Sequence, residues 1–249
     1  ATYLEKIYSG EWSGTMNLTE SGAGSDLGPM KTRAERDGDH YRLFGQKIYI
    51  TWGDHDATEN IVHLVLARLP DAPAGSRGIS LFLVPKLLVE EDGTLGARND
   101  AYPVSVEHKL GIHGSPTCVM AYGDNGGALG YLVGEENQGL ACMFTMMNKE
   151  RMFVGAQGIS QSELAYQNAT AYAKDRNVFN RPIGMNQGIQ HPLAEKWMYL
   201  ESAWLMVEKA ARLYDQGLPC GAEANACKFL AARACHDAAW QAVATHGGF

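Results

Sequence analysis

The sequence predicts an α+β protein in which an antiparallel β-sandwich or barrel domain is followed by an antiparallel helical bundle. Between about Gly10 and Pro103, short runs rich in Val, Ile, Leu and aromatic residues are separated by the turn formers Gly, Pro and Asp. After Gly139 the apolar residues recur instead at the three- and four-residue spacing of a helix. We place the boundary between residues 137 and 138, with a central β-domain over 1–137 and a helical bundle domain over 138–249.

The β-half contains several segments of strand length. They are residues 40–51, 60–69 and 77–86, with a further strand pair expected over 117–124 and 127–133. Asp37 and Gly38 stand between two alternating segments, and this dipeptide favours a hairpin turn there.

Three long helices are expected in the second half. The first covers about 140–174 and is broken over 176–188, which holds Pro182 and two glycines. The second runs from about Pro192 until Gly217 caps it, and the third covers about 222–245. This bundle is one helix short of four, and the chain begins without Met. We therefore expect a fragment that is truncated at both ends and leaves the bundle incomplete.

Composition narrows the class of protein. The chain has 249 residues, 45% of them hydrophobic, and a net charge of −7 without long basic runs, which argues against a nucleic-acid partner. Its five cysteines form no CxxC pair, which predicts a reducing compartment. There is neither a secretory signal nor an apolar run near the roughly 20 residues of a membrane span. We expect a soluble protein, cytoplasmic in a bacterium or in the mitochondrial matrix of a eukaryote.

The segment TESGAGSD (residues 19–26) is rich in small residues but fits neither common phosphate-binding motif. It lacks the Lys-Ser/Thr ending of a P-loop, and Gly28-Pro29 follows it where a dinucleotide-binding fold would start a helix. Two interpretations stay open. It is an ordinary connecting loop, or it is a pocket wall where small residues admit a flat ring or a pyrophosphate to the main chain, with Thr19 and Ser25 as donors.

Two other segments combine polar and apolar residues. In KIYITWG (47–53), Tyr49 and Thr51 are two apart and face one side of a strand, either as core packing or as an aromatic and a hydroxyl beside a conjugated ring. In MMNKERMFVGAQG (146–158), Glu150 and Arg151 are either a solvated pair or a carboxylate in an apolar pocket. Such a pocket raises the proton affinity of a carboxylate, as a base requires.

These motifs together resemble the acyl-CoA dehydrogenase family of flavoproteins, and the resemblance covers essentially the whole chain. MNLTESGAGSD and the following strands to residue 53 resemble the signature of the family's central β-domain, with Ser21 where Pro is usual. KLGIHGSPT (109–117) resembles the strand near the end of that domain. AYAKDRNVFNRPIGMNQGIQHPLA (171–194) resembles the connector between two helices, and THGGF (245–249) the last flavin-contacting turn.

The resemblance implies FAD as cofactor and assigns residues to its parts. Leu18, Thr19, Gly24 and Ser25 would hold the ring and pyrophosphate, with Tyr49, Ile50 and Thr51 beside the ring. The adenosine-diphosphate half would be bound by a neighbouring subunit through Arg176, Asn177, Val178, Gln187, Gly247 and Gly248, which implies a homodimer or homotetramer. Ser25, Asn148 and Arg151 would line the channel for the acyl-CoA substrate.

The resemblance also implies the reaction, which is dehydrogenation of an acyl-CoA thioester to the trans-2-enoyl-CoA. A Glu removes the α-proton while the β-hydride passes to flavin N5, and an electron-transfer flavoprotein takes the electrons. Glu150 matches one of the two places where the family carries this base, and the other place would lie beyond Phe249. The alternatives are an acyl-CoA oxidase that uses oxygen, a non-catalytic flavin-binding relative, and a β-module with a helical stalk that binds no flavin.

Overall fold

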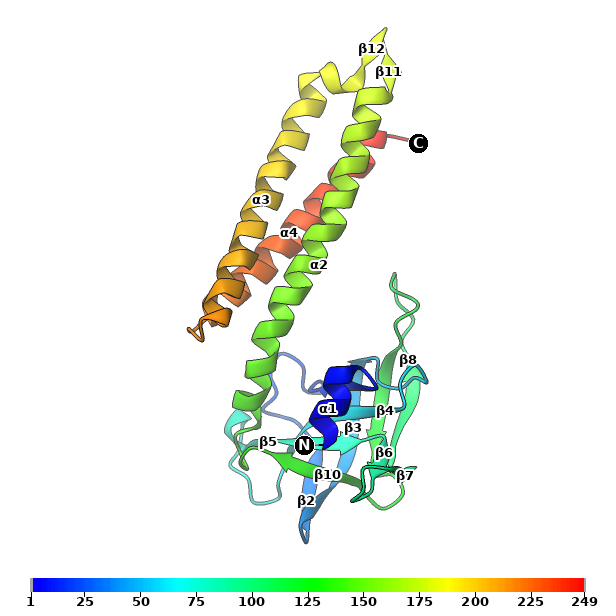
Figure 1. The fold of residues 1–249 in the computed structure, drawn as a ribbon, viewed down its shortest axis with the longest axis vertical. Coiled ribbons are helices and arrows are strands. Elements are labelled where there is room, and N and C mark those ends of the chain that lie inside the picture. The colour runs from blue at the N-terminus through cyan, green and yellow to red at the C-terminus, as the bar shows by residue number, and fades with distance from the viewer. Residues whose placement is uncertain (1, 249) are drawn as a thin grey trace. The chain divides into compact units, whose positions relative to one another are not determined.

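The computed structural model describes residues 2–248 and divides into two compact units. The first unit ends at Met143 and the second begins at Phe144 (Figure 1). Helix α2 (Gly139–Asp175) begins in the first unit and provides the first helix of the second.

Besides the 3-10 helix Ser76–Gly78, the first unit holds one short α-helix and ten strands among its described residues. They are α1 (Thr2–Ser9), β1 (Trp12–Asn17), β2 (Arg33–Asp37), β3 (His40–Thr51), β4 (Asn60–Arg68), β5 (Ile79–Pro85), β6 (Leu87–Val89), β7 (Leu95–Arg98), β8 (Ala101–Val106), β9 (Thr117–Tyr122) and β10 (Ala128–Val133). Strands β6 and β7 form a separate hairpin, and the other eight strands form one sheet. Helix α1 lies where we expected no element.

The large sheet closes back on itself, which confirms the predicted α+β class with a barrel-like sheet. Its strand order is β1-β4-β5-β10-β3-β9-β8, and β2 pairs with both β3 and β4 and so joins the middle of this path to its start. The Asp37–Gly38 turn is confirmed, because Asp37 pairs with His40 and Gly38 has a φ of 67°. A tightly packed core that includes Leu43, Phe82 and Tyr122 fills the interior.

Strand pairing differs from the expectation in two respects. Strand β1 runs parallel to β4 over six residues, so the sheet is not wholly antiparallel. Strands β9 and β10 form as expected but pair with different parts of β3 and not with each other. The reason is the length of β3. Its 12 residues are enough for β10 to pair with residues 41–43 and for β9 to pair within residues 45–51.

Besides the 3-10 helix Ile183–Met185, the described residues of the second unit form three long helices and a short hairpin. They are α2, β11 (Asn177–Val178), β12 (Arg181–Pro182), α3 (Gln187–Asp215) and α4 (Gly221–His246). The helices follow the expected ranges, except that α3 begins five residues before Pro192. Because proline has no N–H, Pro192 cannot donate a hydrogen bond to the carbonyl of Gly188, four residues earlier. Gly188 is exposed, so water can donate to this carbonyl instead.

Small residues allow these helices to pack closely. The shared core combines residues of α2, α3 and α4, and alanines make up much of it. Met152 and Ile159 of α2 are buried in this core, as are Leu200 of α3 and Cys227 of α4. Alanine at successive buried positions of α4 brings its backbone near the neighbouring helices, and this explains why the alanine-rich sequence is central in the unit.

Candidate functional site

The loop after β1 presents its small residues to solvent. Glu20 and Ala23 form a tight turn, because the N–H of each donates to the carbonyl of the other at 2.9 and 3.1 Å. Ser21, Gly22, Gly24 and Ser25 are exposed, whereas Ala23 is buried and fixes the turn against the sheet. The main chain of this loop is therefore accessible to solvent, while Ala23 anchors the loop to the sheet.

Strand β3 lies directly beside this loop. The N–H of Ile48 donates to the carbonyl of Thr19 at 2.9 Å, so the two segments that the resemblance assigns to the flavin ring are in contact. Within β3, Ile50 is 2% exposed, while Tyr49 and Thr51 on either side of it are exposed. Neither side chain is therefore packed in the core of this unit, and the bulge at Tyr49 interrupts the regular alternation of β3.

The backbone of Tyr49 is strained. Its φ is +61°, in the left-handed region that non-glycine residues seldom adopt, and it lies in a bulge where the β3–β9 register shifts between Lys47 and Ile50. Trp52, at the end of the strand, has a φ of +56° and donates its N–H to Pro116. Strain of this kind persists only where surrounding contacts hold it, and it is common at ligand sites.

A buried ion pair holds the loop against β3. Lys47 Nζ lies 2.9 Å from Glu20 Oε1 and 3.0 Å from the carbonyl oxygen of Leu18. The other acceptor positions of Glu20 take hydrogen bonds from the N–H of Lys31 and from the N–H and hydroxyl of Thr32. Every charge in the pair therefore has several partners, as burial requires.

This buried environment shifts the pKa values of both partners. Burial lowers the pKa of Lys47 to about 8, against the opposing effect of Glu20. Burial alone would raise the pKa of Glu20, but the Lys47 ammonium and the hydrogen bonds from Thr32 and Lys31 outweigh it and hold this pKa below its usual value. Both groups therefore stay charged at neutral pH.

The glycines of the loop leave room for a flat ligand. A Cβ placed on Gly22 would meet nothing within 4 Å, and one on Gly24 would meet only the methyl of Thr19 at 3.9 Å. Neither glycine has the positive φ that would demand this residue type. Internal packing thus does not require glycine at these two positions, and the open space beside them is compatible with the expected approach of a ring or diphosphate. The residues of this edge fit FAD.

In the second unit, the residues expected at the substrate lie on one stretch of α2. Arg151 Nη1 donates to Asn148 Oδ1 at 3.2 Å, so these two side chains are in contact. Arg151 also lines a depression of about 430 Å³ with Lys228 and Arg233 of α4. Three cations around one depression favour an anionic ligand.

Glu150 is exposed within its unit. Of the apolar residues that follow it in the sequence, Met152 packs into the bundle core and Phe153 is 59% exposed. The helical period explains the position of Met152, because a residue two places after Glu150 lies on the opposite face of the helix. Phe153, three places after Glu150, shares its face and is itself exposed. Within its unit Glu150 is thus solvent-exposed and does not lie in the apolar pocket of one of the two interpretations.

The end of α2, the β11–β12 hairpin, the start of α3 and the end of α4 lie at one end of the second unit (Figure 1), and these segments carry the residues assigned to the adenosine-diphosphate half. The ring of Tyr172, near the end of α2, stacks on His246 at the end of α4. The carbonyl of Arg176 accepts a hydrogen bond from Ile183 across the short connector. The exposed residues brought to this end are Arg176, Asn177, Val178, Gln187, Gly247 and Gly248. They come from three segments that are far apart in the sequence.

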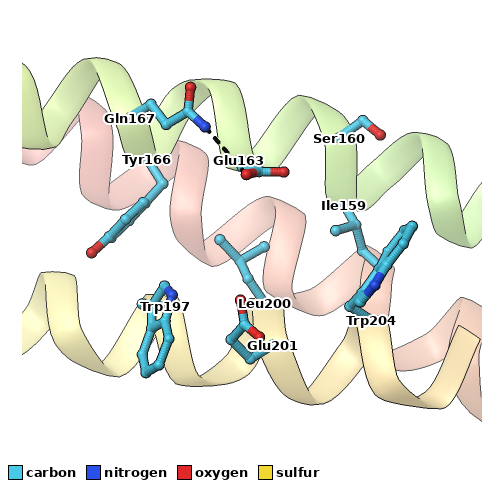
Figure 2. Close-up of a pocket in the computed structure, with 9 residues that line it drawn as sticks. All are labelled: Ile159, Ser160, Glu163, Tyr166, Gln167, Trp197, Leu200, Glu201 and Trp204. Atoms are coloured by element: carbon cyan, nitrogen blue, oxygen red, sulfur yellow. Dashed lines mark hydrogen bonds between the residues drawn. The ribbon is translucent and has the colours of Figure 1, made fainter. Parts of the chain in front are cut away.

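A separate groove lies between α2 and α3. Figure 2 shows Trp197, Trp204 and Glu201 of α3 facing Tyr166 and Glu163 of α2 across it, and its volume is about 440 Å³. None of the residues that the resemblance assigns to cofactor or substrate lines this groove. It is therefore not the candidate site.

Two features are absent from the part of the chain that the structure describes. Over residues 2–248, no three His, Cys, Asp or Glu side chains come together in a way that could hold a metal ion. In the same range, no helix combines the length and apolar character needed to cross a membrane.

Comparison with known families accounts for both units. Residues 15–124 match the family model described as acyl-CoA dehydrogenase, middle domain, and residues 137–249 match that described as acyl-CoA dehydrogenase, C-terminal domain. The chain belongs to the acyl-CoA dehydrogenase family. The resemblance inferred from the motifs is thereby confirmed.

Individual members of the family show the extent of the similarity. The chain is 56% identical over 198 residues to the 3-methylmercaptopropionyl-CoA dehydrogenase of Ruegeria pomeroyi, an alignment that covers 77% of this chain and 33% of that protein. It is 36% identical over 248 residues to an acyl-CoA dehydrogenase of Bacillus subtilis, with 99% of this chain and 61% of that protein covered.

A solved structure shows the same fold. The chain matches a chain in the structure described as the electron transferring flavoprotein of Acidaminococcus fermentans with a TM-score of 0.80 and 29% identity, over 94% of this chain and 58% of that one. The chain thus spans between 33% and 61% of the length of these three acyl-CoA dehydrogenase-like proteins.

Sequence reasoning missed the residues that support the candidate site. Glu20 and Lys47 were noted only as parts of motifs, although a lysine inside the apolar run KIYI is an unusual residue for a strand that is half buried. That lysine, with an acid in the neighbouring loop, was the available signal for a buried pair. The stacking of Tyr172 on His246 has no comparable signal, because 74 positions of sequence separate the two rings.

Proposed function

We propose that this protein catalyses the FAD-dependent α,β-dehydrogenation of an acyl-CoA thioester to the trans-2-enoyl-CoA. The observation that carries the proposal is the hydrogen bond between Ile48 and Thr19, which joins the glycine loop to the exposed face of β3. Open glycines, a hydroxyl and an exposed aromatic ring then lie together on one edge of the β-unit. Family membership supports this use of that edge.

For the cofactor, the proposal assigns the same residues as the resemblance does. Leu18, Thr19, Gly24 and Ser25 would hold the ring and pyrophosphate, and Tyr49, Ile50 and Thr51 would lie along the ring. FAD supplies an acceptor for the hydride of the substrate's β-carbon, which no side chain can do. The protein's part is to bind this group, orient it and exclude water around it.

The exposed end of the second unit would bind the adenosine-diphosphate half of FAD from a neighbouring subunit. The six residues gathered there support this proposal, because they combine a guanidinium, amides and glycine main chain, all suited to a diphosphate. A homodimer or homotetramer follows from it, since each FAD would then contact two chains.

Glu150 is the proposed base for the α-proton. In an acyl-CoA thioester this proton is acidified by the carbonyl, so a carboxylate of moderate strength suffices when it is well placed. Asn148, Arg151 and Ser25 would position the substrate. The cationic depression that includes Arg151, Lys228 and Arg233 supports an anionic substrate such as a CoA thioester.

An electron-transfer flavoprotein is the proposed acceptor of the electrons. The similar structure that is described by that name supports a partner of this class. Oxygen is the acceptor in the competing proposal of an acyl-CoA oxidase.

The test uses the purified full-length protein. It should be yellow, release FAD on denaturation, and lose its visible flavin absorbance when acyl-CoA is added without oxygen. A colourless protein that does not take up added FAD would contradict the proposal. If bleaching occurs but oxygen is consumed rapidly in air, the oxidase is the correct alternative, whereas a flavoprotein that no acyl-CoA bleaches is a non-catalytic relative.

A further inference from the structure

The pair of Glu20 and Lys47 is the most completely buried ion pair found in the described part of the chain. The Lys47 side chain is 0% exposed and that of Glu20 is 8% exposed. The other ion pairs of the first unit lie nearer the surface, such as Arg36 with Glu136, whose side chains are 46% and 30% exposed. Two charges have thus been removed from water at one particular place in the β-unit.

The pair connects three separate segments of chain. Lys47 belongs to β3, and its ammonium reaches the carbonyl of Leu18 as well as Glu20. Glu20 in turn binds the main chain of residues 31 and 32, which lead into β2. A single pair of side chains thereby fixes the loop over 18–25 against the bulged part of β3.

Stability alone does not account for such a pair. Desolvation of two charges offsets most of their attraction, so well-packed apolar residues of similar volume hold a fold as well or better. Unlike apolar residues, the pair forms directional hydrogen bonds, and these fix specific carbonyl and N–H groups in place. The strained Tyr49, two residues from Lys47, needs such fixed surroundings.

We propose that Glu20 and Lys47 act as a positioning pair, which holds the glycine loop and the Tyr49 bulge in the one arrangement that binds the flavin ring. The inference rests on the proposed function, since it takes this edge to be the FAD site. Neither side chain touches the ring in this proposal. They act through the main chain of Leu18 and Thr19 and through the strand that carries Tyr49 and Thr51.

The test compares the double variant E20Q/K47M with N99A in the full-length protein. The double variant removes both charges and nearly keeps the volume, and the remaining amide oxygen at position 20 can still accept from the N–H and hydroxyl of Thr32, so the protein is expected to fold. Asn99 is 3% exposed and bonds Pro85 and Leu129, so N99A disturbs a buried part of the same sheet that contacts neither segment. The single variants E20Q and K47M serve to show that the charges depend on each other.

Two measurements are made on each variant, namely the dissociation constant for FAD and the hydrogen exchange of the flavin-free protein. We expect E20Q/K47M to bind FAD at least about tenfold more weakly than N99A and to shift the visible flavin spectrum, because the site is no longer pre-organised. Amide exchange should accelerate over residues 18–25 and 47–51 in the double variant only. N99A should be the less stable protein and yet keep the wild-type affinity for FAD.

Equal FAD affinity in E20Q/K47M and N99A would overturn the inference, and so would exchange that is unchanged over the two segments. A wild-type protein that fails to bind FAD would overturn the proposed function and, with it, the flavin-binding role of the pair. The exchange data would then still show whether the pair holds the two segments, so the two failures are distinguishable.

Discussion

The rings of Tyr172 and His246 stack with their centroids 4.4 Å apart and their planes inclined by 25°. This contact joins the end of α2 to the end of α4, and Arg176 and Gly247 directly follow these two helices in the sequence. If the segments after these helices bind the adenosine-diphosphate half of FAD, loss of the stack should lower the affinity for FAD.

The first prediction concerns this stack. Replacing His246 by Ala removes ring contacts worth about 0.5–1.5 kcal/mol, so FAD binding should weaken by roughly threefold to tenfold. Binding of FMN, which lacks the adenosine end, should not change. Titration of the flavin-free protein with both cofactors measures this, with His236→Ala on the exposed face of α4 as control. Equal losses for FAD and FMN would place the effect elsewhere.

The second prediction concerns the base. Replacing Glu150 by Gln keeps the shape and removes the proton acceptor, so the rate of flavin bleaching by acyl-CoA should fall at least about 100-fold with FAD still bound. Glu163→Gln is the matched control, because it changes an exposed carboxylate of the same helix. Undiminished bleaching in Glu150→Gln would mean that another residue is the base.

The third prediction uses the strained backbone of Tyr49. Its φ of +61° costs an alanine about 1 kcal/mol that a glycine does not pay, so Tyr49→Gly should be more stable than Tyr49→Ala by about that amount. Urea unfolding of the flavin-free proteins measures the difference. Both variants should bind FAD more weakly than the wild type, because both lack the exposed ring. If Tyr49→Ala is the more stable of the two, the positive φ is not kept in solution.

The fourth prediction concerns pH. His63 is 1% exposed, and burial lowers its pKa from 6.5 to about 3. Its Nδ1 lies 2.7 Å from the Thr15 hydroxyl, whereas Nε2 has no partner in the described residues. A folded-state pKa below the unfolded value means that the unfolded chain binds the proton first. Stability is therefore complete above pH 6.5 and is lost as the pH falls toward 3.

When the pH falls from 7 to 5, protonation of this histidine in the unfolded chain should lower the unfolding free energy of the first unit by about 2 kcal/mol. Urea unfolding at the two pH values should show the loss in the wild type and a smaller one in His63→Gln. An exposed histidine, His108, provides the control, since His108→Gln should keep the wild-type difference. The same pH dependence in all three proteins would show that other groups cause it.

Much of the fold could be predicted because local patterns determine it. The apolar spacing after Gly139 predicted α2 and α4 to within a few residues, and the Asp37–Gly38 turn predicted its hairpin. The parallel pairing of β1 with β4 was not predictable, because it joins segments more than 40 residues apart. Register between distant strands depends on the packing of the whole sheet, which no local pattern encodes.

The candidate site was predicted in the same unequal way. Motifs identified Thr19, Tyr49 and Glu150, but they did not reveal that Thr19 binds Ile48 or that Glu150 is exposed within its unit. The exposure of a side chain follows from what packs beside it, and the neighbours come from remote parts of the chain.

By itself, the sequence determined the family of this protein and its two kinds of secondary structure, and it predicted the segments that we propose bind FAD and substrate. All of these follow from residue types and from spacing along the chain. Only the tertiary structure decided that a buried lysine and glutamate join the glycine loop to β3, and that rings of α2 and α4 meet at one end of the bundle. Burial is the physical reason, because a charge or a ring takes its energetic role from the solvent it loses and the partners it gains on folding.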